Sequence, residues 1–211
     1  MQIHLWIVGV TLVGLAGLNP PLAILALGLG SASTKLVLRA ELGWLVTPTM
    51  LWVWSALLVV QFLADLYFVP ATVRDRTYLH GARLVNAYLN ARFQSFFRPL
   101  AAALALAALP SPLPAQSAAV LGFVGGTAIY WLTAWIREQV AISRGSVILL
   151  LMEMAKNMLA LVAAVLMVWA APLALGVLAS VLAPVALWAA RLRREQLRYS
   201  AYGGRIAPED S

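Results

Sequence analysis

Residues 44–76 read WLVTPTMLWVWSALLVVQFLADLYFVPATVRDR, a long apolar run that ends in a basic segment. Near the end of the apolar part, Gln61 and Asp65 stand four residues apart, so a helix places both on one face. An ionisable residue inside so apolar a helix is costly to insert and is by default a functional-site candidate. The stretch therefore predicts a membrane-spanning helix that carries a polar site.

The composition points to the same class of protein. Hydrophobic residues make up 63% of the 211-residue chain and charged residues only 11%, whereas soluble domains average about 45–50% and about 25%. A bilayer can cover that much apolar surface. The net charge of +7 comes from arginines that flank apolar runs, which is typical of the positive-inside rule and not of nucleic-acid binding. We expect an all-α, polytopic transmembrane helical bundle.

The apolar runs predict about six spans within a single transmembrane domain, residues 1–190, followed by a basic cytoplasmic tail, residues 191–211. The predicted spans are residues 3–29, 44–68, 99–115, 116–136, 146–170 and 173–190. The run 99–115 is short and ends in three closely spaced prolines, Pro110, Pro112 and Pro114, so it either crosses or is re-entrant. With six crossings and both termini in the cytoplasm, twelve Lys and Arg residues lie inside and two outside. This bias favours a crossing for 99–115 and predicts a multi-pass protein of the bacterial cytoplasmic (inner) membrane.

The first span contains the sequence Asn19-Pro20-Pro21. Two prolines remove two backbone donors and disfavour helix at the residue before them, so the helix must kink or break there. A broken helix at membrane depth is tolerated where protein or a water-filled cavity satisfies the freed carbonyls. The break is thus either a substrate-facing feature or a packing kink.

Residues 70–98 differ from the spans because apolar and basic residues alternate at roughly helical spacing. This pattern favours an amphipathic helix on the anionic cytoplasmic leaflet, although an ordinary basic loop fits as well. The arginines expected to bind anionic lipid are Arg74, Arg76, Arg83, Arg92 and Arg98.

A second polar group interrupts the predicted span 146–170. Glu153, Lys156 and Asn157 share one helical face, at a depth that overlaps that of the polar face of span 44–68. The predicted intramembrane polar site therefore consists of Asn19, Gln61, Asp65, Glu153, Lys156 and Asn157. It is either a cytoplasm-facing cavity for an ion, a proton or a lipid head group, or a set of polar contacts that only locks helices together.

The stretch QFLADLYFVPATVRDR, followed by RPLAAALALAA, resembles an uncharacterised bacterial membrane-protein family, domain of unknown function 4126. The matching positions are Asp65, Pro70, Asp75, Arg98 and Pro99. Leu66 stands where that family has a basic residue, and the insertion 76–97 is longer. The similarity covers roughly residues 14–110 and implies a small integral membrane protein of unassigned function.

We therefore expect a small transporter or channel, with a lipid-binding or scaffold protein acting through its basic segment as the alternative. An intramembrane enzyme that pairs Asp65 with Glu153 is a weaker hypothesis, because the chain has no cysteine and no catalytic, metal or cofactor signature. Membrane lipids, including anionic ones, are the expected partners. So short a chain is small for enclosing a pathway alone, which favours a homo-oligomer.

Overall fold

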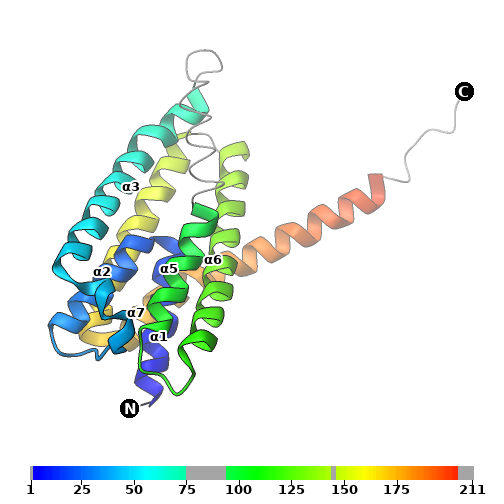
Figure 1. The fold of residues 1–211 in the computed structure, drawn as a ribbon. Coiled ribbons are helices and arrows are strands. Elements are labelled where there is room, and N and C mark those ends of the chain that lie inside the picture. Colours follow the sequence, from blue (N-terminus) through cyan, green and yellow to red (C-terminus); the bar gives the residue numbers. More distant parts are fainter. Residues whose placement is uncertain (1, 75–93, 144–145, 204–211) are drawn as a thin grey trace, which may run out of the picture. The chain divides into compact units, whose positions relative to one another are not determined.

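The computed structural model describes residues 2–74, 94–143 and 146–203, and within them every regular element is a helix (Figure 1). The elements are α1 (Gln2–Leu18), α2 (Pro20–Ala32), the 3-10 helix η1 (Ala40–Val46), α3 (Pro48–Arg74), α5 (Gln94–Ala107), α6 (Ala115–Ser143) and α7 (Ser146–Gly203). The chain divides into two units, Met1–Leu178 and Ala179–Ser211. The second unit contains the last part of α7, whose helix continues through the first half of the predicted tail to Gly203.

Two of the helices are long and apolar enough to cross a membrane. They are Ala115–Arg137 within α6 and Leu150–Arg194 within α7, counting only the described residues. A third candidate exists if η1 and the first part of α3, which meet at an angle of 51°, form one broken span. The all-α helical bundle is confirmed, whereas the prediction of six spans exceeds what these helices show.

The predicted break at Asn19 is present, but it reverses the chain instead of kinking one crossing. Gly9, in the middle of α1, lies against Leu106 at the end of α5 and Leu109 just beyond it, whereas Gly17 at the end of α1 accepts a hydrogen bond from Arg98 near the start of α5. After α2, the amide of Arg39 donates to the carbonyl of Ala108 at 2.9 Å, at that same end of α5. The α1–α2 pair therefore starts and finishes at one end of the bundle and forms a helical hairpin (Figure 1).

This geometry corrects the interpretation of residues 3–29 as one span. Asn19 has an extended backbone (φ −149°, ψ 95°) that interrupts the helix, and Pro20 and Pro21 begin α2, where their missing N–H groups cost least. At about 1.5 Å per residue, the 13 residues of α2 reach roughly 20 Å. That is short of the ~30 Å hydrocarbon core, and α1 and α2 are each shorter than the helices long enough to cross a membrane.

Close packing of α5 on α6 forms the centre of the first unit. A Cβ atom at Gly122 would lie 2.4 Å from the carbonyl oxygen of Ala102, and one at Gly126 would lie 2.6 Å from the Cβ of Ala102. Such distances leave no room for a side chain, so the two backbones approach as closely as small residues permit. Gly125 makes a similar approach to Val13 of α1. The small residues at these three positions thus let α6 pack closely on both α5 and α1.

We predict that Gly122→Ala destabilises the protein, because its methyl group overlaps the α5 backbone and overpacking costs about 1–3 kcal/mol. The melting temperature in detergent micelles should fall. Gly176→Ala is the matched control, since a Cβ there meets nothing within 4 Å and alanine favours helix. Equal melting temperatures for Gly122→Ala and the wild type would contradict the α5–α6 packing.

Candidate functional site

Asn19 connects the hairpin tip to α7. Its side-chain oxygen accepts a hydrogen bond from the amide of Leu22 at 3.3 Å and so caps the N-terminus of α2. Its side-chain nitrogen donates to Oδ1 of Asn157 at 3.3 Å. Both side chains are buried. Two of the predicted polar residues, 138 positions apart, are therefore in direct contact.

Arg98 of α5 binds the other side of the same break. The carbonyl of Gly17 would accept a helical hydrogen bond from residue 21, but Pro21 has no N–H. Arg98 supplies the missing donor, with Nη1 3.1 Å from the Gly17 oxygen. A buried carbonyl without a partner costs about 1–3 kcal/mol. The hydrogen bond from the guanidinium removes this cost and stabilises the helix break inside the bundle.

The remaining contacts of Arg98 also lie within the protein. Its Nε donates to Oε1 of Gln94 at 2.5 Å, its Nη1 lies 3.3 Å from Oγ1 of Thr133, and its guanidinium lies 5.6 Å from the ring centroid of Tyr130. The residue is only 5% exposed. The prediction that Arg98 binds anionic lipid therefore does not fit its position, because the side chain points into the bundle.

Glu153 of α7 is the buried carboxylate of the site. One of its oxygens accepts from Nε of Arg137 at 2.8 Å, and the other accepts from the ammonium of Lys156. Arg98 also acts electrostatically on this carboxylate. We call Arg98, Arg137, Glu153, Lys156 and Asn157 the charged cluster. It combines groups from α5, α6 and α7 next to the hairpin tip.

The other predicted site residues have different positions. Gln61 is buried in α3, and no hydrogen bond joins it to the charged cluster among the described contacts. Asp65 and Arg74 belong to α3, but their side chains lie outside the described part of the structure. Arg76, Arg83 and Arg92, with most of the predicted amphipathic segment, fall outside the described residues. The predicted membership of Asp65 in the polar site stays a prediction.

Sequence reasoning missed Arg98 and Arg137 as members of the site. Arg137 directly follows the predicted span 116–136, whereas α6 continues as helix to Ser143. A usable signal was present, since Arg137 and Glu153 are each eight residues from position 145, and antiparallel helices bring such positions level. For Arg98, the signal was a lone arginine that opens an alanine-rich apolar run.

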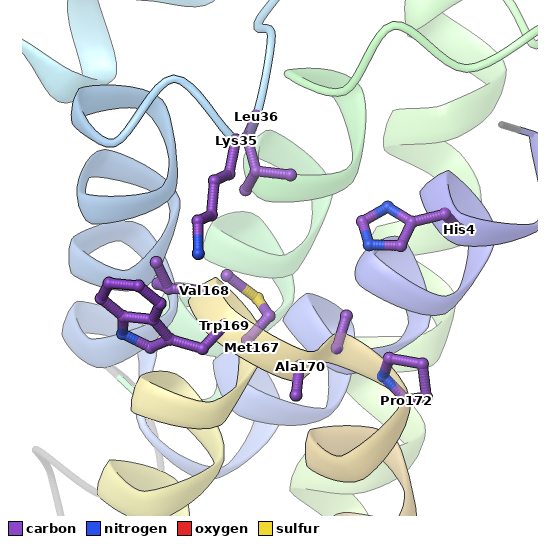
Figure 2. Close-up of a pocket in the computed structure, with 9 residues that line it drawn as sticks. His4, Lys35, Leu36, Met167, Val168, Trp169, Ala170 and Pro172 are labelled. Atoms are coloured by element: carbon purple, nitrogen blue, oxygen red, sulfur yellow. The ribbon is translucent and has the colours of Figure 1, made fainter.

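A cavity of about 380 Å³ lies where α7 breaks at Ala170 (Figure 2). Pro172 cannot donate to the carbonyl of Val168, so the break exposes acceptors at a helix end. The ammonium of Lys35 lies 3.6 Å from the ring centroid of Trp169, where the negative end of the helix dipole favours a cation. The cavity is lined by His4, Lys35, Leu36 and residues 167–172.

The described part of the chain is thus an all-helical bundle with membrane-length apolar helices and a charged cluster in its interior. It contains no group of three His, Asp or Glu side chains placed to hold a metal ion. Comparisons with protein-family models, curated proteins and solved structures find no match for the chain. The resemblance to the family of domain of unknown function 4126 stays a prediction.

We predict that Arg98→Met lowers stability, because it leaves the Gly17 carbonyl buried without its donor. Hydrogen bonds to charged groups contribute about 1.5–3 kcal/mol each, and the melting temperature in micelles reports the loss. Arg193→Met, at an exposed position of α7, is the matched control and should change stability by less than about 0.5 kcal/mol. An Arg98→Met protein as stable as the wild type would show that the break does not depend on this contact.

Proposed function

We propose that the chain is a small multi-pass transporter or channel of the bacterial inner membrane, with the charged cluster as its ion-binding site. The observation that carries the proposal is Glu153, held between Arg137 and Lys156 directly beside the hairpin tip. Charged groups at membrane depth are costly and are concentrated on ion and substrate pathways. Broken helices with their tips near the midplane recur at such sites.

The helical hairpin suggests a revised topology, with five crossings and one re-entrant element. The crossings are η1 with α3, then α5 together with the connection that leads to α6 (residues 94–114), then α6 and the two parts of α7. The 45 residues of Leu150–Arg194 measure about 68 Å at ~1.5 Å per residue, enough for two passages of a ~30 Å core. The N-terminus then joins Lys35 and Arg39 on the outer side, and the arginine-rich segments stay in the cytoplasm. The revision changes the proposed side of the N-terminus. Once Arg98 and Arg137 are assigned to the charged cluster, ten cationic residues remain inside against two outside, so the bias is kept.

Glu153 has a definite role in this mechanism. It keeps two cations in place in the absence of a transported ion, because unpaired charges in a low-dielectric interior are strongly disfavoured. An arriving ion competes for one of these contacts, and the carboxylate re-forms the pair after the ion leaves. A pathway needs binding that is favourable enough for entry and weak enough for release. Association of several copies of the chain would enclose such a pathway.

The direct test is ion flux through liposomes that contain the purified protein, measured separately for potassium, chloride and protons. We predict that Glu153→Gln lowers the flux that the wild type supports by roughly 10- to 100-fold, because Arg137 and Lys156 then lose the carboxylate that holds them in place. This factor corresponds to the free energy of one charge-assisted hydrogen bond, about 1.5–3 kcal/mol. Glu41→Gln, at an exposed position of η1, is the control and should conduct as the wild type does. Absence of flux for all three ions would refute the proposal.

Water access distinguishes an ion site from a dry helix lock. The chain has no native cysteine, so single cysteines can be labelled with a membrane-impermeant thiol reagent. We predict rapid labelling of Asn157→Cys from the cytoplasmic side and none of Ala160→Cys, which is fully buried one turn further along α7. Equal protection of both positions would mean that the cluster is a dry structural contact.

A further inference from the structure

Two buried hydrogen-bond donors on α3 have no acceptor in the described structure. They are Nε1 of Trp54 and Nε2 of Gln61, in residues only 6% and 8% exposed. Buried polar groups are nearly always hydrogen-bonded, so each exception requires an explanation. Seven residues separate the two positions, which puts both on one face of α3, two turns apart.

The indole of Trp54 packs on the residue of α5 that precedes Arg98. Its ring stacks on that of Phe97 with the centroids 5.9 Å apart, and Phe97 is the residue before Arg98. The buried donor therefore lies at the level at which Arg98 binds the hairpin tip. Gln61 continues the same face of α3 toward the end of the bundle at which α6 and α7 are joined.

The side chains around this region are mainly donors. Arg and Lys side chains have no acceptor, and the indole N–H only donates. Arg98, Arg137 and Lys156 bring three such cationic groups into the charged cluster, and Glu153 is the one carboxylate whose side chain is described there. An incoming cation meets repulsion from three sides. An incoming anion accepts hydrogen bonds from the guanidinium, ammonium, indole and amide groups.

We infer that the ligand of the charged cluster is a small monovalent inorganic anion, bound between the Trp54–Gln61 face of α3 and the cations of α5, α6 and α7. The inference rests on the proposed function and identifies the substrate class of that same site. The anion occupies the unfilled acceptor positions at Trp54 and Gln61 and competes with Glu153 for Arg137 and Lys156. The N–H donors of Trp54 and Gln61 need a hydrogen-bond acceptor, and neither a metal cation nor a proton can accept a hydrogen bond.

The full-length protein in liposomes tests this with chloride, potassium and proton flux measured in parallel. The expected result is chloride efflux once valinomycin carries potassium out of the liposomes and so compensates the charge. Nitrate should substitute for chloride. Potassium or proton flux without chloride flux would overturn the inference and leave the proposed function intact. Absence of flux for all three ions would overturn the proposed function. Binding of an anion to the site is therefore measured in a separate experiment.

Iodide quenching of tryptophan fluorescence provides that separate measurement in detergent micelles. Saturable quenching is expected in the wild type and in Trp52→Phe, since Trp52 is highly exposed and lies on the same helix. Trp54→Phe keeps an aromatic ring against Phe97 but removes the N–H, so the saturable component should disappear. Gln61→Leu should weaken it about tenfold, as expected for one lost hydrogen bond. If Trp54→Phe fails to fold, Gln61→Leu alone decides. Purely linear quenching in the wild type, as for freely accessible indoles, would mean that no anion site exists and that water fills these positions.

Discussion

The hydrogen bond from Arg98 to the Gly17 carbonyl is the contact on which the interior arrangement depends. Pro20 and Pro21 deprive α1 of donors at its C-terminus, and an apolar environment has no water to replace them. The guanidinium donates to one freed carbonyl, and the side-chain oxygen of Asn19 accepts from the first free amide of α2. With these partners the chain can end one helix and begin another at depth. Without them, the reversal would expose backbone groups that an apolar interior does not tolerate.

The same solution recurs at the end of α5. Arg39 donates from Nε to the Leu109 carbonyl at 2.9 Å and from Nη2 to that of Ser111 at 3.0 Å. Its other side-chain bond, also from Nη2, goes to the carbonyl of Leu113. A proline-rich connection, residues 108–114, is thereby held against the loop that follows α2. In both places, an arginine far away in sequence donates to backbone carbonyls where the helical hydrogen bonds end.

How much of this arrangement the sequence predicts depends on the range of each interaction. Hydrophobic runs establish the helical class, and a proline pair establishes the break at Asn19, because these are local effects. The i, i+3 spacing likewise places Glu153 with Lys156 on one face. The direction taken after the break is not local, since two prolines allow a kink and a reversal equally. That direction is decided by tertiary contacts, in which Gly9 packs against α5 and Arg39 bonds to Ala108. For the same reason, the sequence alone does not distinguish Arg98 from the basic residues of a surface segment, because its partner Gly17 is far away in sequence.

The burial of the charged groups bears on whether the cluster is a lock or a site. The Glu153 side chain is 4% exposed, those of Lys156 and Arg137 11% and 21%. An exposed ion pair contributes little to stability because solvent screens it, and a buried pair has to offset the desolvation of both charges. Here side-chain exposure increases outward from the carboxylate, first to Lys156 and then to Arg137. Arg137 is also the member nearest the connection between α6 and α7. The gradient favours a site that opens toward that connection, at the end of the bundle where Gln61 continues the donor-lined face of α3.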